Sequence, residues 1–354
     1  MAGERIVVAM SGGVDSSVAA ALLAEQGYQV IGLMMQLWSE PGDGADNRCC
    51  TLDAVDSARW VADRLGIPFY LFNVKAPFRA HVVDYFVREY VAGHTPNPCL
   101  MCNRHLRFDV LLRRALALDA RYLATGHYAR LRRTDGRHRL LKSVDRSKDQ
   151  SYVLYMLNQE ILYHVVFPLG DYTKTQVREM ARQRGLPVAD REESQDLCFL
   201  ADGDYRRFLK EKAPAAVQPG PIIDRQGRML GQHKGLPFYT IGQRRGLGIA
   251  APQALYVLEI DITRNALIVG TATELGRSEL TASGVSYVSG KIPGKPMRVM
   301  AKIRYKARES PGLLTPLPGD RIALRFDEPL RDITPGQGVV FYQREELIGG
   351  GIIE

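Results

Sequence analysis

The 354-residue sequence lacks several features that would assign it to a special class of protein. It has no run of about 18 apolar residues, which a membrane-spanning helix needs, and no internal repeat or low-complexity tract. A strand is expected from about residue 5, which leaves no room for a signal or transit peptide. Its five cysteines are an odd number in a long chain, so a disulfide scaffold is not expected and reactive or metal-binding thiols become the question. These absences predict a cytoplasmic protein with no membrane partner.

The composition is that of an ordinary globular protein with a basic balance. Apolar residues make up 45% of the chain and charged residues 24%. The 47 lysines and arginines outnumber the 39 acidic residues, which gives a formal net charge of +8. Such an excess suits a polyanionic partner such as RNA, although many basic proteins bind none. The length predicts two or three domains.

The stretch SGGVDSS, residues 11–17, follows the apolar run 6–10 and precedes the helical pattern 18–23. A strand that opens onto a Gly/Ser turn and then a helix presents backbone N–H groups and the positive end of a helix dipole at one point. The paired glycines let the backbone approach an anion, and the three serine hydroxyls can donate to it. No lysine follows, so the stretch is not a Walker A loop. It predicts a phosphate-binding loop; the alternative is a plain connection with Asp15 or Ser16 near a helix cap.

Apolar runs alternate with helical patterns through the first half of the chain. Buried strands are predicted at 6–10, 30–35, 69–72 and 122–127. One intervening helix is predicted from the apolar residues Leu52, Val55, Trp60, Val61 and Leu65, and another from Phe78, Val82, Tyr85, Phe86 and Tyr90. This alternation predicts an α/β fold with a doubly wound parallel sheet covered on both faces. Ligands then bind at the carboxyl ends of the strands, where Met35, Gly126 and His127 lie.

Two further stretches of the first half carry local signals. The arginine-rich stretch 130–141 predicts a hairpin turning at 135–136; its alternative is a solvated basic face. Residues 152–157 form an amphipathic segment by pattern. Thr173 and Gln176 have the spacing of a helix capping box.

The second half of the chain is poor in helix formers. The Pro- and Ala-rich stretch 213–221 indicates a boundary. Short strands are predicted within 231–248, 255–260 and 267–270, and then at 298–305, 321–326, 338–342 and 347–353, a pattern typical of a small β-barrel. We therefore expect a catalytic domain over residues 1–210, a central domain of mainly short strands over 211–278 and a C-terminal β-barrel over 279–354.

Cys99 and Cys102 form a C-x-x-C pair within 94–103, which the two prolines there predict to be a loop, with Asn103 capping the next helix. This spacing lets two sulfurs converge and is used by redox pairs, metal sites and sulfur-handling enzymes. No second C-x-x-C completes a zinc site, so His105 is the nearest further ligand candidate. A mixed zinc site and two merely buried thiols are the alternatives. Cys198, taken alone, reads as a core residue.

Several motifs together resemble one enzyme family. The 11–17 stretch resembles the pyrophosphate-binding loop of the ATP pyrophosphatase superfamily, whose members adenylate a substrate and release pyrophosphate. With it occur, in order, Pro96-Asn97-Pro98 with Cys102-Asn103, Thr125 to Arg130, Lys148 to Tyr152, Glu193 to Phe199, Thr240 to Gly248 and Thr334 to Gln337. This set is similar to the bacterial tRNA-specific 2-thiouridylases almost from end to end. The resemblance implies an adenine nucleotide alpha hydrolase-like N-terminal domain and ATP-driven exchange of oxygen for sulfur at C2 of a wobble uridine.

The resemblance also implies roles for individual residues. Cys198 would carry the incoming persulfide, and Cys102 would help release its sulfur through a transient disulfide with Cys198 or a related intermediate. The implied ATP site comprises Ala9, Met10, Ser11, Gly12, Gly13, Val14, Asp15, Ser16, Met35 and Gly126, with Mg²⁺ bridging the phosphates and Asp15 as its ligand or water holder. The implied tRNA contacts are Asn97, Pro98, Cys99, His127, Lys148, Asp149, Gln150, Arg304, Tyr305 and Gln337. Without the family, His127 reads as a satisfied histidine at a strand end, and Arg304 with Tyr305 as a solvated strand face.

The implied partners are a tRNA with a wobble uridine, as in the tRNAs for Lys, Glu and Gln, and a sulfur donor such as a cysteine desulfurase or persulfide carrier. A departure concerns Cys99, since an aspartate stands there in the best-known branch of the family. Cys99, Cys102 and Cys198 can therefore also be read as three ligands of an iron–sulfur cluster, or Cys99 and Cys102 as a protective disulfide. The rival functions are another ATP-dependent synthetase with the same loop, and a tRNA-binding module with a vestigial nucleotide site.

Overall fold

The computed structural model describes residues 3–40, 52–189, 191 and 197–354. Its N-terminal part is built on a parallel sheet in the order β3-β2-β1-β4-β7. The strands are β1 (Arg5–Ala9), β2 (Gln29–Gln36), β3 (Phe69–Asn73), β4 (Tyr122–Ala124) and β7 (Val165–Val166). The predicted parallel sheet is confirmed, and β1 at its centre delivers the chain directly into residues 11–17.

Helices cover both faces of this sheet. One layer holds α1 (Val14–Glu25), α2 (Leu52–Leu65) and α8 (Lys174–Gln183). The other holds α3 (Lys75–Phe78), a π-helical segment (Arg79–Val83) and α4 (Asp84–Val91), then α5 (Pro98–Met101), a second π-helical segment (Cys102–Leu111) and α6 (Leu112–Leu116). Within β1, Ile6 and Val8 pack in the apolar cluster of the first layer, whereas Val7 packs in that of the second. Because side chains alternate along a strand, this arrangement confirms that the sheet is covered on both faces.

The predicted apolar face of α2 is partly wrong. Leu52 is 70% exposed and Trp60 43% exposed. The buried residues are Ala54, Ala58, Val61 and Ala62. Small side chains on this face let α2 approach the phosphate-binding loop closely, and a count of large apolar residues does not reveal that.

The central part holds α9 (Tyr205–Lys212) and a four-stranded sheet in the order β10-β11-β8-β9. The strands are β8 (Gly220–Ile223), β9 (Met229–His233), β10 (Tyr256–Asp261) and β11 (Ala266–Gly270). The strands expected near 255–260 and 267–270 are confirmed, but 234–248 contains no strand. Gly235, Gly242, Gly246 and Gly248 all have positive φ there, which is incompatible with extended backbone.

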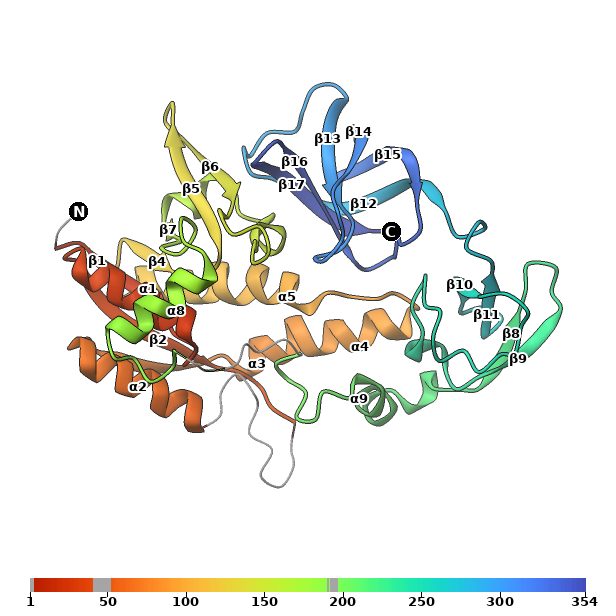
Figure 1. Cartoon of the computed structure of the whole chain (residues 1–354), viewed down its shortest axis with the longest axis horizontal. Helices are drawn as coiled ribbons and strands as arrows, with labels where there is room; N and C mark the ends of the chain where they lie inside the picture. Colours follow the sequence, from red (N-terminus) through yellow and green to blue (C-terminus); the bar gives the residue numbers. More distant parts are fainter. Residues whose placement is uncertain (1–2, 41–51, 190, 192–196) are drawn as a thin grey trace.

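The C-terminal part is the predicted β-barrel. Its strands are β12 (Arg277–Tyr287), β13 (Met297–Lys302), β14 (Ser310–Leu317), β15 (Arg321–Leu330), β16 (Gly338–Gln343) and β17 (Glu346–Ile353). They follow the order β12-β15-β14-β13-β16-β17, and pairing of β12 with β17 closes the barrel. Sequence patterns missed β12 and β14, and they placed 303–305 in a strand that ends at Lys302. In Figure 1 the barrel lies above the segment that joins α4 to α5.

The predicted hairpin is confirmed, with β5 (Ala129–Thr134), β6 (Arg137–Lys142) and positive φ at Asp135 and Gly136. It also extends the barrel sheet, because β6 pairs with β17. Residues 151–157, which include a short 3₁₀ turn, are buried throughout instead of amphipathic, since this segment is enclosed between the N-terminal part and the barrel.

The capping box at the start of α8 is confirmed by the hydrogen bond from the Gln176 N–H to the Thr173 hydroxyl. In the described part of the chain, no helix is both long and apolar enough to cross a membrane.

Candidate active site

Serine side chains of the phosphate-binding loop hold its backbone in place. The Ser16 and Ser17 hydroxyls donate to the Gly13 carbonyl over 3.2 and 2.9 Å, and the Ser11 N–H donates to the Ser16 hydroxyl over 3.1 Å. Gly12 has a φ of +72°, and a Cβ there would stand 2.3 Å from the Ala54 carbonyl oxygen. Only glycine fits both the conformation and the space. The N–H groups at the start of α1 remain for an anion.

A lysine distant in sequence reaches this loop. Lys174, the first residue of α8, places its Nζ 2.8 and 2.7 Å from the two carboxylate oxygens of Asp15. The Tyr128 hydroxyl donates to the same carboxylate over 2.7 Å. Sequence reasoning noted the missing lysine of a Walker A loop but did not find Lys174. Its signal was weak: a lysine at the start of a helix, where the dipole disfavours a cation, needs a reason to be there.

The remaining residues expected to bind ATP gather at the carboxyl edge of the sheet. Ala9 ends β1, and the Met10 N–H donates to the Leu33 carbonyl of β2 over 2.9 Å. Met35 lies near the end of β2. A Cβ at Gly126 would stand 3.0 Å from the Asp15 backbone carbon and from the Ser16 nitrogen. The structure therefore brings together residues from three segments that the sequence separates.

The C-x-x-C pair lies on a helix, so the loop expected at 94–103 is wrong in its second half. Pro98 occupies the first position of α5, where its missing N–H is not needed. Asn97 caps the helix, since its side-chain oxygen accepts the Cys99 N–H over 3.1 Å. Asn103, the expected cap, is buried and donates to the Val153 carbonyl over 2.8 Å. Helical geometry places Cys99, which is exposed, and Cys102, which is 7% exposed, about one turn apart.

Cys198 comes from a separate segment and is half-buried. Both Cys198 and Met35 pack against the apolar cluster that contains Cys102. The next residue, Phe199, anchors this segment because its ring lies 5.2 Å from that of Phe86 and 5.7 Å from that of Phe208. Residues 193–196 of the expected motif lie outside the described residues.

The alternative reading of Cys99, Cys102 and Cys198 as ligands of an iron–sulfur cluster finds no support among the described residues. Among the described residues, no group of three His, Cys, Asp or Glu side chains is arranged to hold a metal ion. Cys99, Cys102 and Cys198 thus do not present the ligand set that an iron–sulfur cluster needs. His105 instead stacks on His81 with ring centroids 4.6 Å apart, and burial together with His81 and Arg104 lowers the pKa of His105.

His127 is buried, with 8% of its surface exposed. Its Nδ1 lies 2.7 Å from the Thr125 hydroxyl, and its ring packs between Phe108 and Phe167. Burial first, and then the nearby Arg107 charge, lowers the pKa of His127 to about 3. The imidazole is therefore neutral at physiological pH.

Asp149 and Gln150 make internal hydrogen bonds. The carboxylate of Asp149 accepts the Ser143 N–H over 2.9 Å and the Ser151 hydroxyl over 2.8 Å. The Gln150 side chain accepts the Tyr128 N–H over 3.0 Å, and the Gln150 N–H donates to the Tyr128 carbonyl. Tyr128 thus joins this segment to Asp15. Lys148, which is half-buried, precedes it.

Thr95, in the N-terminal part, contacts both the barrel and the central part. Its N–H donates to the Pro335 carbonyl over 2.8 Å, and its carbonyl accepts from Gln337 Nε2 over 2.7 Å. Its hydroxyl donates to the Thr240 hydroxyl over 3.1 Å. These contacts from the barrel and the central part hold the segment that enters α5 two residues before its cap, Asn97.

Arg304 and Tyr305 lie in the loop after β13, not on a strand face. Arg304 forms an ion pair of 2.8 Å with Asp332. The ring of Tyr305 lies 5.9 Å from that of Tyr152. Tyr305 therefore lies against the buried segment 151–157.

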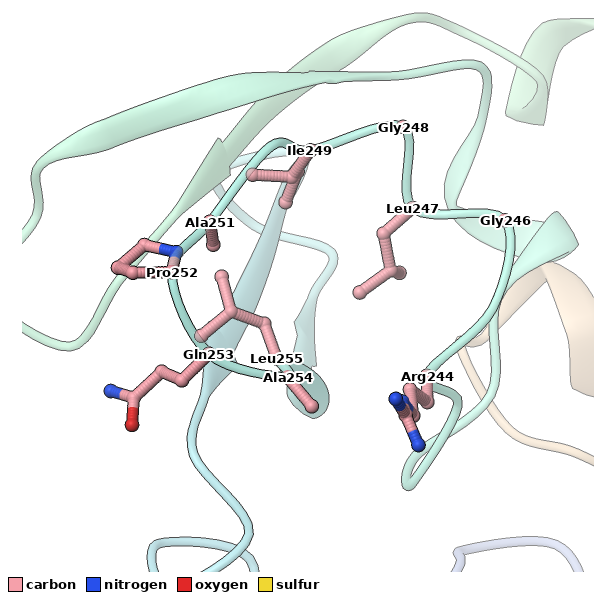
Figure 2. A pocket seen from close by; sticks show the side chains of 10 residues that line it. All are labelled: Arg244, Gly246, Leu247, Gly248, Ile249, Ala251, Pro252, Gln253, Ala254 and Leu255. Atoms are coloured by element: carbon pink, nitrogen blue, oxygen red, sulfur yellow. The ribbon is translucent and has the colours of Figure 1, made fainter.

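A cavity of about 420 Å³ lies elsewhere, in the central part of the chain (Figure 2). It is lined by residues 244–255 except Arg245 and Ala250, and Figure 2 labels the lining side chains, of which Arg244 and Gln253 are the polar ones. Neither the phosphate-binding loop nor a cysteine lines it, so it is separate from the chemistry above.

Three family models match the chain in succession. A tRNA methyl transferase HUP domain matches residues 4–202, a tRNA methyl transferase PRC-barrel domain 206–271 and an aminomethyltransferase beta-barrel domain 277–353. A protein of Pelotomaculum thermopropionicum is 51% identical over 360 residues, covering 100% of this chain and 98% of the relative. A protein of Moorella thermoacetica is 52% identical over 353 residues, covering 98% and 99%. Both relatives carry the name tRNA-specific 2-thiouridylase MnmA.

Proposed function

The chain belongs to the tRNA-specific 2-thiouridylase family, and from this membership we propose how its residues carry out the reaction. It is a tRNA-uridine 2-sulfurtransferase with an ATP-using HUP domain. The substrate is tRNA, and the reaction replaces O2 of a uridine with sulfur. The order of chemical events and the residues responsible are the proposal.

In the first step, ATP activates the uracil carbonyl. A carbonyl oxygen is a poor leaving group, so O2 attacks the α-phosphorus of ATP, pyrophosphate leaves and the N3 proton is lost to water. The N–H groups of residues 12–16 face the phosphates from the start of α1. Mg²⁺ enters as part of the nucleotide substrate, held mainly by phosphates and water. Asp15 is paired with Lys174, and the pair carries no net charge, so we assign Asp15 to holding the nucleotide's Mg²⁺ or one of its waters, with Lys174 fixing the carboxylate in place.

In the second step, sulfur replaces the adenylated oxygen. The terminal sulfur of a Cys198 persulfide attacks C2, and the C2–O bond breaks with AMP as the leaving group. The Cys102 thiolate then attacks the Cys198 sulfur, and the electrons of the broken S–S bond stay on the sulfur attached to C2. N3 then regains a proton from water, and the products are 2-thiouridine and a Cys102–Cys198 disulfide, which a thiol reductant returns to two thiols.

The observation that carries this assignment is the shared apolar cluster. Cys102 belongs to it, and both Cys198 and Met35, from the edge that holds ATP, pack against it.

The tRNA surface is proposed from the placement of the expected residues. Asn97, Pro98 and Cys99 lie at the start of α5. Arg304, Tyr305 and Gln337 lie on loops of the barrel, and Gln337 contacts Thr95, two residues before Asn97. The target base must leave the anticodon stack to reach the thiols. His127 and Asp149 are buried, so we propose that His127 meets the tRNA as a neutral imidazole and that Asp149 holds its segment in place through its hydrogen bonds. Lys148 offers the positive charge of that segment.

Further parts of the proposal concern partners and organisation. The domain division at residues 210 and 278 remains a proposal; these residues fall within α9 and β12. We assign the tRNAs for Lys, Glu and Gln as substrates, a cysteine desulfurase or persulfide carrier as the sulfur donor, and the cytoplasm as the location. No step is assigned to an iron–sulfur cluster, because the three cysteines do not form a fitting ligand set in the described structure.

The test separates the two steps by measuring two products. Purified enzyme is incubated with tRNA, Mg-ATP and a persulfide donor, and pyrophosphate and 2-thiouridine are measured, the latter by mass spectrometry of digested tRNA. Cys198→Ser is expected to release pyrophosphate but to form no 2-thiouridine. Full thiolation by Cys198→Ser would contradict the sulfur step, and no pyrophosphate from wild type would contradict the ATP step.

A further inference from the structure

The Gly12–Gly13 peptide of the phosphate-binding loop is held from outside the loop. Arg191 Nη1 donates to the Gly12 carbonyl oxygen over 3.0 Å and to the Ser57 hydroxyl of α2 over 3.2 Å. In a trans peptide the C=O and N–H groups point in opposite directions. Because the guanidinium holds the Gly12 carbonyl, the Gly13 N–H is directed away from it.

A peptide between two glycines needs such a restraint. Glycine visits more backbone conformations than any other residue, so this peptide can rotate at little steric cost. Rotation would turn the carbonyl dipole toward an anion and remove an N–H donor from it. A guanidinium is a suitable restraint because it keeps its charge at any physiological pH and its fork has fixed geometry.

Arg191 is itself placed by α8. Arg178, on that helix, donates from Nη1 to the Ala189 carbonyl over 2.7 Å and from Nη2 to the Arg191 carbonyl over 3.2 Å. Ala189 is buried in the same apolar cluster as α1. The helix that brings Lys174 to Asp15 therefore also brings Arg191 to Gly12, and the two cations contact the loop at its two ends.

We infer that Arg191 is a positioning residue of the ATP site, which holds the Gly12–Gly13 peptide with its N–H toward the nucleotide phosphates. This inference rests on the proposed ATP site. The Nε and Nη2 groups of Arg191 donate to no residue within the described ranges, so the same side chain adds positive charge next to the phosphates. Arg191 thereby supplies, from 179 residues away, part of the charge that a Walker A lysine supplies within its own loop.

The chain offers a matched control at the other end of α1. Arg184 pairs with Glu25 through two hydrogen bonds of 2.7 Å and so also ties the α8 region to α1, but far from the loop. Arg191→Ala and Arg184→Ala each remove one guanidinium and one tether between the same two regions. Only the first should change the handling of ATP.

The experiment measures KM for ATP, kcat and thermal stability with full-length enzyme, tRNA and a persulfide donor. Arg191→Ala is expected to raise KM for ATP about tenfold or more and to change kcat at saturating ATP by less than about threefold, the loss typical of a hydrogen bond to a charged donor. Arg191→Lys, which keeps the charge and a donor, should recover KM to within about threefold of wild type. Arg184→Ala should lower the melting temperature and leave KM for ATP within about twofold.

Two results would overturn the inference. One is a KM for ATP within about twofold of wild type in Arg191→Ala. The other is an equal rise of KM in Arg191→Ala and Arg184→Ala, which would show a general loss of packing. A wild-type enzyme whose thiolation does not depend on ATP would instead contradict the proposed function, so the two failures are distinguishable.

Discussion

The strongest titration effect among the proposed site residues is expected at His127, and the variant His127→Gln tests it. The pKa of His127 is lowered by burial, because the ring packs against Phe108 and Phe167 and its Nδ1 lies beside the Thr125 hydroxyl. Glutamine keeps a polar side chain of similar length but does not titrate. The variant therefore removes the protonation equilibrium while keeping a hydrogen-bonding group near Thr125.

The size of the effect follows from the two pKa values of His127. Burial lowers the folded-state pKa from 6.5 to about 3. Below about pH 6.5 the unfolded chain binds a proton that the folded chain does not, so the free energy of unfolding falls as the pH drops through this window and is unaffected above it. A pH of about 5 lies about 1.5 units below the unfolded-state pKa of 6.5. At about 1.4 kcal/mol per unit, the free energy of unfolding falls by about 2 kcal/mol.

The assay is urea unfolding at about pH 7.5 and about pH 5, followed by tryptophan fluorescence. The sequence has only two tryptophans, Trp38 and Trp60, and both belong to the N-terminal part that contains His127. Between the two pH values, wild type is expected to lose about 2 kcal/mol more stability than His127→Gln. Thr125→Val is the control, because it removes the hydroxyl but leaves the imidazole buried and so should retain the wild-type pH dependence. An equal loss in wild type and His127→Gln would refute the reasoning.

Two further pairs of substitutions, each a test and its control, examine local geometry by stability and activity. Asn97→Ala should lower the free energy of unfolding by about 1 kcal/mol and slow thiolation. Asn158→Ala, which removes the equivalent cap of α7 (Gln159–Tyr163), should lower stability similarly and leave thiolation unchanged. Equal thiolation activity of the two variants would contradict the role of the Asn97 cap. Gly170→Ala should lower the free energy of unfolding by about 3 kcal/mol, because its Cβ would stand 1.9 Å from the Ala129 carbonyl oxygen. The control is Gly294→Ala, whose Cβ meets nothing within 4 Å, and it should change stability by less than about 0.5 kcal/mol in the same denaturation assay.

Contacts among the three parts of the chain explain why the cysteine helix has a defined start. Thr95, two residues before the cap of α5, donates hydrogen bonds to Pro335 and Thr240 and accepts one from Gln337. The buried turn at 151–154 adds a second connection, since the Tyr152 hydroxyl donates to the Gly338 carbonyl over 2.8 Å. The barrel and the central part therefore fix the segment that leads to Cys99 and Cys102.

Local patterns were sufficient for much of the fold. Alternating apolar runs and helices predict the parallel sheet because each strand buried on both faces must be apolar throughout. The phosphate-binding loop, the hairpin at 135–136 and the capping box at Thr173 depend on a few adjacent residues, so they were predictable as well. The start of α5 was predicted wrongly because proline forbids the interior of a helix but not its first position, and only the capping by Asn97 distinguishes the two cases.

The sequence by itself determined the family, the sheet edge where ATP is expected and the three thiols available for sulfur chemistry. Tertiary structure decided which distant side chains reach the phosphate-binding loop. Lys174 and Arg191 lie 159 and 179 residues from their partners on the loop, and no local pattern links residues so far apart. Both depend on how α8 packs against α1, which is set by apolar burial over the whole layer and not by the loop's own residues. The loop first identified as an anion site without a lysine thus has two cations, and folding alone brings them there.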